Sequence, residues 1–277
     1  MPSAIAAETL FEKAKRYNLI QFEDFDFKRN CLLIVNCDSD LFLHPSLRSL
    51  YKNVDPSEFS LIVFDNSYST KFNIDIYNNY GFKNILFFNN CIEYIKDLGT
   101  SNRTIFQASK CIADNSASIM HCFTIDMMMK ILKARGTKNL IIADSDVIFK
   151  RNPFDVIDNN YATIGGYNEV LHRIDPYFQY MNLDLLTIDY FDATRMLGLS
   201  TGDYTKYDTG VAFTEDIISK SLPYRIIDIE KYVEHFGGGS CANFKERKYV
   251  RDVNVLGKPR LSYELVWEWL KSNQKYL

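Results

Sequence analysis

Residues 140–149 read LIIADSDVIF, a run in which two acidic residues interrupt an otherwise apolar stretch. The residues before Asp144 have the composition of a buried strand, and VIF resumes the apolar pattern after Asp146. Two carboxylates placed two residues apart at the end of a buried strand cost stability unless something cationic lies beside them. The stretch therefore predicts a cation at this point of the chain.

Three earlier segments repeat the same design of four or five apolar residues followed by polar ones. With the segment around Asp144 they make four predicted strands, at 31–40, 59–70, 83–90 and 138–146. Short apolar runs bounded by polar residues are typical of parallel strands covered on both faces. Residues 116–136 carry apolar side chains at helical spacing and end at Gly136, which predicts a helix. This alternation predicts an α/β domain with a doubly wound, mostly parallel sheet.

Ligands of such sheets bind beyond the carboxyl ends of the strands. All four predicted strands place Asp or Asn residues at that edge: Asn36, Asp38, Asp65, Asn66, Asn89, Asn90, Asp144 and Asp146. One polar strand end would be a solvated turn, but four in register across a sheet indicate a binding edge.

The second half of the chain is less regular than the first. Residues 161–170 read as a strand, 206–213 (KYDTGVAF) as a loop that enters a strand, and 261–277 as an amphipathic helix. A further helix is predicted at residues 4–17. Because no Pro/Gly/Ser linker, repeat or low-complexity tract interrupts the chain, residues 1–277 are expected to form a single domain.

Composition restricts the function classes. The net charge of −3 on 277 residues gives no electrostatic argument for a nucleic-acid partner. Six scattered cysteines without CxxC pairs argue against a zinc ribbon or a disulfide scaffold and favour reduced thiols in a cytoplasmic protein. The N-terminus lacks the pattern of a signal peptide, and no apolar run approaches the roughly 18 residues of a membrane span. We expect a soluble cytoplasmic protein.

Between about residue 31 and residue 245, the order of elements resembles the GT-A class of nucleotide-sugar glycosyltransferases, like families 2 and 8. The sharpest part of the resemblance is Asp-x-Asp at the end of the fourth predicted strand, followed by VIF. The resemblance implies a GT-A, Rossmann-like fold with a nucleotide-sugar-binding half at 1–150. Residues 151–277 would form an acceptor-binding half that includes the C-terminal helix.

The same resemblance implies a metal-dependent hexosyltransferase that moves a sugar from a nucleoside-diphosphate sugar, with UDP favoured, to a hydroxyl acceptor. The expected partners are this donor and a glycan or lipid-linked acceptor in surface-polysaccharide biosynthesis. Work on lipid-linked acceptors would bring the protein to the inner face of the membrane. The C-terminal helix is expected to pack on the domain; pairing with a second chain in a homo-oligomer and peripheral membrane contact are the alternatives.

A divalent cation would neutralise the diphosphate leaving group as the glycosidic bond breaks. The resemblance implies that Asp146 binds this metal directly, that Asp144 contacts the ribose or the metal through water, and that His235 completes the coordination. Carboxylate and imidazole together suit Mn²⁺, with Mg²⁺ as the alternative. Gly238 and Ser240 would bring backbone N–H groups to the diphosphate. The alternative for His235 is an exposed side chain on a flexible turn.

Other donor contacts also follow from the resemblance. Asp65 would hold the base or the ribose, and Asn36 would line the base pocket. His121 and Asp126, near the start of the predicted helix, would face the nucleotide, although a plain helix-surface histidine is an equal alternative.

An inverting transferase needs a carboxylate to take the proton of the attacking hydroxyl. Asp208 is the first candidate for this base, with a turn-forming or capping aspartate as the alternative reading. Asp203, Glu169 and Asp175 are further candidates, and inversion or retention is left open.

Three other functions compete with the transferase. A sugar-nucleotide nucleotidyltransferase usually carries a Gly-rich phosphate loop after the first strand, and VNCDSDLFLHP has no glycine there. A phosphatase with an Asp nucleophile fits CDSDL (37–41) only superficially. A non-catalytic glycan-binding protein on the same fold would have no reason to keep Asp146 and His235 as a pair.

Overall fold

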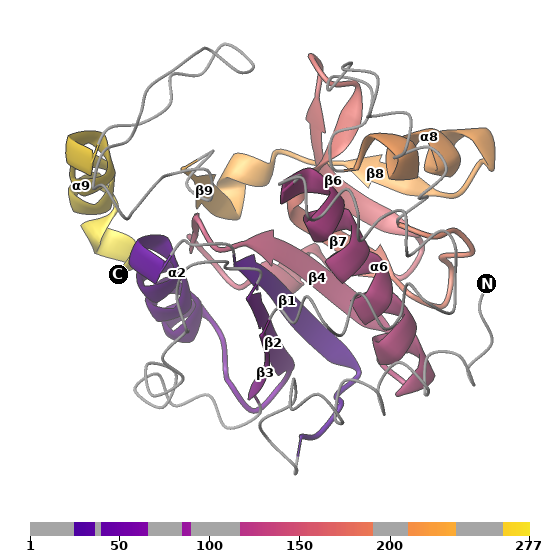
Figure 1. Cartoon of the computed structure of the whole chain (residues 1–277), viewed down its shortest axis with the longest axis horizontal. Coiled ribbons are helices and arrows are strands. Elements are labelled where there is room, and N and C mark those ends of the chain that lie inside the picture. The colour runs from indigo at the N-terminus through magenta and orange to yellow at the C-terminus, as the bar shows by residue number, and fades with distance from the viewer. Residues whose placement is uncertain (1–24, 37–39, 66–84, 90–116, 191–209, 237–262) are drawn as a thin grey trace.

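The computed structural model describes residues 25–36, 40–65, 85–89, 117–190, 210–236 and 263–277 (Figure 1). The predicted helix at 4–17 lies outside these residues. The strands are β1 (Asn30–Asn36), β2 (Ser60–Asp65), β3 (Ile85–Asn89), β4 (Asn139–Asp144), β5 (Val147–Phe149), β6 (Thr163–Asn168), β7 (Arg173–Asn182), β8 (Tyr224–Ile226) and β9 (Val233–His235). The helices are α2 (Asp40–Asn53), α6 (Ala117–Ala134), α8 (Val211–Ser219) and α9 (Tyr263–Ser272), with 3-10 turns η1 (Pro153–Val156), η4 (Ile229–Lys231) and η7 (Gln274–Tyr276).

Seven strands form the central sheet in the order β3-β2-β1-β4-β7-β6-β8, and β5 pairs with β9 in a separate two-stranded sheet. The first four strands of the order are parallel, as predicted. Beyond β4 the sheet is mixed, because β7 runs antiparallel to both β4 and β6. The architecture is thus a mixed α/β fold with a mainly parallel sheet.

The register confirms that the polar strand ends share one edge. Asn36 lies beside Asp65, Asp65 lies beside Asn89, and Asp144 lies beside Val35, the residue before Asn36. Parallel strands in register bring their carboxyl ends together, so a polar residue after each apolar run reaches the same place. The other predicted members of this edge, Asp38, Asn66 and Asn90, lie outside the described residues.

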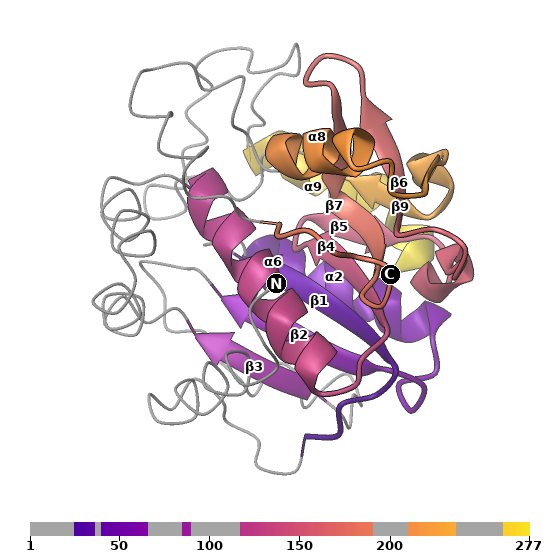
Figure 2. The same ribbon diagram turned by 90° about the vertical axis from the view of Figure 1, so that its right-hand side faces the viewer.

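Helices cover the sheet on both faces (Figure 2). Ile125, Met128 and Leu132 of α6 pack with alternate strand residues such as Leu33. Leu43, Leu47 and Leu50 of α2 pack with the intervening ones, such as Leu32. Because successive strand residues point to opposite faces, the two helices lie on opposite sides of the sheet.

The C-terminus of α6 shows why the sequence signal at Gly136 was informative. Gly136 has φ +86°, in the left-handed region that glycine adopts without strain. Its N–H donates to the carbonyl of Lys133, and the N–H of Thr137 donates to the carbonyl of Leu132. This pair of bonds is the Schellman arrangement that ends many helices. The chain then turns directly into β4, the strand that carries Asp144.

The second half departs from one prediction and confirms two. Residues 206–209 of the predicted loop lie outside the described residues. The strand expected after it is wrong, because helix α8 begins at Val211 with Gly210 as its N-cap. Phe213 and Ile217 are both buried in the same cluster as α6. Because residues four apart lie on one face of a helix, the helical conformation buries both side chains together. The strand at 161–170 is present as β6, and the C-terminal helix as α9. Within the described ranges, no helix combines the length and apolarity needed to span a membrane.

Candidate metal centre

Three predicted ligands converge at the carboxyl edge of the sheet. Asp144 ends β4, Asp146 lies in the turn before β5, and His235 ends β9. One ligand atom from each lies within 4.8 Å of the others. Nε2 of His235 is 3.3 Å from Oδ1 of Asp146 and 4.0 Å from Oδ2 of Asp144. Asp146 is buried, and the other two side chains are partly exposed, so the cluster is open on one side.

Strand pairing brings these residues together although they are far apart in the chain. Val147, directly after Asp146, pairs with His235 across the antiparallel β5–β9 ladder. The N–H of Phe236 extends this ladder by donating to the carbonyl of Asp146 at 2.9 Å. The apolar residues VIF, which are all buried, anchor β5. His235 therefore ends a strand, which contradicts the alternative of an exposed histidine on a turn.

A second layer of side chains orients the first. Nε2 of His121, from α6, lies 3.0 Å from Oδ1 of Asp144. The ring of Tyr177, from β7, stacks on the His235 imidazole with centroids 3.9 Å apart and planes at 10°. Outer contacts of this kind fix the orientation of metal-binding side chains.

The charges around Asp144 favour its ionised form. Burial raises the pKa of this carboxyl, but His121, His235 and Arg173 together lower it below its ordinary value. Asp144 is thus held ready as an anionic oxygen ligand.

A buried ion pair lies within electrostatic range of the cluster. Nε of Arg173 is 3.6 Å from Oδ1 of Asp175, and each residue is 8% exposed. Both are on β7, whose pairing with β6 is irregular. Gly165 pairs with Gln179 and Tyr167 pairs with Ile174, so β7 has extra residues between the two pairs. Irregularities of this type re-aim side chains near functional sites.

Sequence reasoning missed Arg173 and Tyr177 and named Asp175 only as a further candidate base. A signal for the pair was present, since HRIDPYFQY sets a cation and an acid two residues apart in a largely apolar and aromatic run. This is the same kind of interruption that drew attention to Asp144 and Asp146.

The structure gives different outcomes for the other predicted site residues. Asn36 and Asp65 sit side by side at the ends of β1 and β2, where Asn36 is fully buried; only the backbone of Asp65 is described. His121 contacts Asp144, as described above. Asp126 makes other contacts: it pairs with Lys130 and accepts a hydrogen bond from the N–H of Tyr190 at 2.8 Å. The remaining candidates, Asp208, Gly238, Ser240 and Asp203, lie outside the described residues, and Glu169 is exposed.

The donor set of the cluster suits a divalent cation. Two carboxylates and one imidazole offer oxygen and nitrogen ligands without a thiolate, a combination compatible with Mn²⁺ or Mg²⁺. The partial exposure of Asp144 and His235 leaves room for water or for substrate oxygens to complete the coordination.

Comparison with known proteins bears on the fold. No protein-family model and no curated protein sequence matches the chain. Among solved structures, core-mannan synthase A from Aspergillus fumigatus, in its Mn/GDP form, matches with a TM-score of 0.50 at 10% identity, over 88% of this chain and 86% of that one. The chain has the GT-A glycosyltransferase fold. The match establishes the arrangement of helices and strands, and the chemistry depends on the residues of the site.

Two other solved glycosyltransferases match with lower scores. Mouse xyloside xylosyltransferase 1 matches with a TM-score of 0.46 at 12% identity, over 72% of this chain and 85% of that one. The galactosyltransferase LgtC, in complex with donor and acceptor sugar analogues, matches with a TM-score of 0.43 at 13% identity, over 72% of this chain and 73% of that one.

Proposed function

We propose that this protein is a metal-dependent glycosyltransferase that moves a sugar from a nucleoside-diphosphate sugar, UDP-sugars being favoured, to a hydroxyl acceptor. The observation that carries the proposal is the convergence of Asp144, Asp146 and His235 at the carboxyl edge of a GT-A sheet. A protein that only bound glycans would gain nothing from two acids and a histidine at this point.

In this proposal Asp146 and His235 hold the cation, and Asp144 holds it directly or through water while His121 orients the carboxylate. The cation, Mn²⁺ or Mg²⁺, would supply charge neutralisation for the diphosphate leaving group. Arg173 adds a fixed positive charge close to Asp144, and Tyr177 keeps the His235 ring in one orientation.

The nucleoside is proposed to bind at the ends of β1 and β2. Asn36 and Asp65 lie beside one another there, one strand away from Asp144. The Asn36 amide can donate to a base edge and accept from it, and the Asp65 carboxylate can accept hydrogen bonds from ribose hydroxyls. The half at 1–150 would thus bind the donor.

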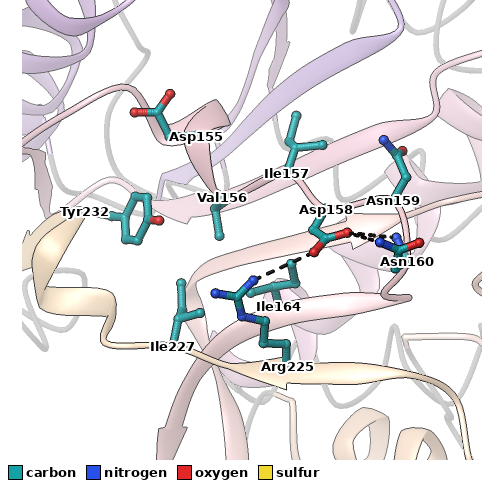
Figure 3. Close-up of a pocket in the computed structure, with 10 residues that line it drawn as sticks. All are labelled: Asp155, Val156, Ile157, Asp158, Asn159, Asn160, Ile164, Arg225, Ile227 and Tyr232. Atoms are coloured by element: carbon teal, nitrogen blue, oxygen red, sulfur yellow. Dashed lines mark hydrogen bonds and ion pairs between the residues drawn. The ribbon is translucent and has the colours of Figure 1, made fainter.

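The acceptor is proposed to bind the half at 151–277, where a cavity of about 400 Å³ opens (Figure 3). Asp158 and Arg225, 3.7 Å apart, form one wall, and Ile164 and Ile227 provide an apolar surface beside them. Tyr232, which also lines the cavity, lies three residues before His235. Asn159, another lining residue, contacts Asn182 opposite Asn139 at the start of β4, so the cavity extends away from Asp144. The cavity surface is mostly polar, and its hydrogen-bonding groups suit the hydroxyls of a sugar. A glycan or lipid-linked glycan in polysaccharide synthesis is the acceptor class that we propose.

The decisive experiment is donor hydrolysis across a panel of UDP-, GDP-, CMP- and dTDP-sugars, with Mn²⁺ and then with EDTA. We expect release of one nucleotide that requires the metal and is lost in Asp146→Ala. Asp228→Ala, an exposed aspartate next to Lys231, is the matched control and should keep full activity. No turnover of any donor, together with no metal-dependent nucleotide binding, would overturn the proposal.

The acceptor cavity has a separate test. Arg225→Ala should raise the KM for an acceptor oligosaccharide about tenfold and leave the KM for the donor unchanged, because the cavity is proposed to touch only the acceptor. Equal changes in both KM values would argue against this assignment.

A further inference from the structure

The C-terminal helix contacts the residue that follows His235. Trp269 and Leu270 of α9 meet Phe42 of α2 and Phe236, the residue that follows His235. Ring centroids are 4.9 Å apart for Phe236 and Trp269 and 4.6 Å apart for Phe42 and Phe236. These three rings, Phe42, Phe236 and Trp269, are called the aromatic cluster below.

Phe236 connects the aromatic cluster to two candidate ligands, to one by a covalent bond and to the other by a hydrogen bond. Phe236 is bonded to His235, and its N–H donates to the carbonyl of Asp146 at 2.9 Å. A shift of Phe236 would therefore move a ligand on each side, His235 through the chain and Asp146 through the hydrogen bond.

Strand pairing alone is a weak support for His235. The β5–β9 ladder joins only three residues of each strand, and isolated two-stranded pairings are marginal in water. Side-chain packing must supply the rest. Tyr177 supports the imidazole ring itself, and the aromatic cluster supports the backbone that follows it.

The aromatic cluster is also separate from the main core. Among the described residues, two large groups of buried side chains surround the sheet with α6 and α2. The third group comprises Phe42, Phe236 and Leu270, with Trp269 and Leu277 against it. Regions held by few buried contacts open locally without unfolding the whole domain. Loosening α9 should therefore disturb the centre and spare the sheet.

We propose that α9 is a positioning element of the metal centre: Trp269, through Phe236, holds His235 at Asp144 and Asp146. The inference rests on the proposed function, since it takes these three residues as ligands of a divalent cation. Trp269 touches neither the cation nor a substrate, so it acts as a positioning residue.

The test is Mn²⁺ binding by the 277-residue protein, measured from the EPR signal of free Mn²⁺. We expect Trp269→Ala to raise the Kd at least tenfold, the scale of losses when outer contacts of metal ligands are removed. Trp269→Phe keeps a ring against Phe236 and should lie between this variant and the wild type. Trp267→Ala is the matched control, because Trp267 is on the same helix, is 43% exposed and is not part of the aromatic cluster.

A second readout does not depend on metal. The Phe236 amide, which donates to Asp146, should exchange with solvent deuterium at least tenfold faster in Trp269→Ala, while the amides of β1 and β4 keep their protection. Wild-type Mn²⁺ affinity together with wild-type exchange at Phe236 in Trp269→Ala would overturn the inference. A wild-type protein that binds no Mn²⁺ would refute the proposed function instead, and the exchange rate would then decide by itself whether α9 holds Phe236. Should Trp269→Ala fail to fold, Trp269→Phe takes its place in both measurements, with the same direction of change.

Discussion

Nε2 of His121 lies 3.0 Å from Oδ1 of Asp144, which ties the start of helix α6 to the end of strand β4. Helix α6 covers one face of the sheet, and this contact fixes its first turns to the carboxyl end of β4. It leaves Oδ2 of Asp144 directed toward His235, at 4.0 Å. One carboxylate thus faces a helix with one oxygen and the candidate metal centre with the other.

Removing this contact should weaken metal binding. We expect His121→Ala to lower Mn²⁺ affinity by about 10–100-fold, the usual effect of losing the partner that orients a metal ligand. His121→Gln retains an N–H donor and should lose less. Isothermal titration with Mn²⁺ measures both variants, and equal affinity in His121→Ala and the wild type would show that Asp144 needs no such support.

The buried pair of Arg173 and Asp175 should matter for stability as well as for charge. Arg173→Met leaves the Asp175 carboxylate buried without its cation, which costs about 3–5 kcal/mol of unfolding free energy. The double variant Arg173→Met/Asp175→Leu removes both charges and should recover much of this loss. Urea unfolding of the two single variants and the double variant forms the thermodynamic cycle. Additive losses would mean that the two side chains do not interact.

Gly165 is predicted to be needed for stability, because a side chain there would clash with Ile174 on β7. A Cβ atom at this position would lie 2.7 Å from Cγ2 of Ile174, a side chain that is itself buried. Gly165→Ala should cost about 1–3 kcal/mol, the range for overpacked cores. In an Ile174→Ala background the same substitution should cost much less.

Gly136→Ala provides the contrast for this experiment, because nothing lies within 4 Å of its Cβ position and only its φ of +86° is strained by a side chain. Its cost of about 1–2 kcal/mol should not depend on Ile174. An equal cost for Gly165→Ala in both backgrounds would contradict the steric explanation.

Cys31 should be inert in the folded protein. Burial raises the pKa of its thiol far above the ordinary value of 9.0, and the residue is fully enclosed in β1. Because the folded state keeps the proton and the unfolded state releases it, this group contributes less to stability as the pH rises above 9.0. Since the thiolate is the reactive form, iodoacetamide at pH 8 should label Cys31 only after denaturation. Peptide mass spectrometry reads the result, and rapid labelling of native protein would show that β1 is not a central strand.

Local patterns predicted the elements whose signal is local. Four apolar runs became four parallel strands, and Gly136 marked the end of α6, because burial and backbone conformation are written into neighbouring residues. The acids at 144 and 146 were recognisable for the same reason. Helix α8 was misread because KYDTGVAF is too short to distinguish an apolar helical face from a strand.

Contacts between distant segments could not be predicted in the same way. Nothing near His121 indicates that it meets Asp144, and nothing near Tyr177 indicates that it stacks on His235. These relations depend on which strands pair and in which direction. The reversal at β7, antiparallel to β4, brings Arg173 and Asp175 toward the edge where β4 ends. A purely parallel continuation would have carried them to the opposite edge.

The pairing of β5 with β9 also determines when, during translation, the three proposed ligands can come together. Both acids leave the ribosome well before His235, which follows Val147 by roughly 4–18 s at translation rates of about 5–20 residues per second. During that interval the nascent chain carries Asp144 and Asp146 but lacks His235, so one of the three proposed cation ligands is missing. On the proposed function, tight cation binding would therefore mark a chain in which β5 and β9 have already paired.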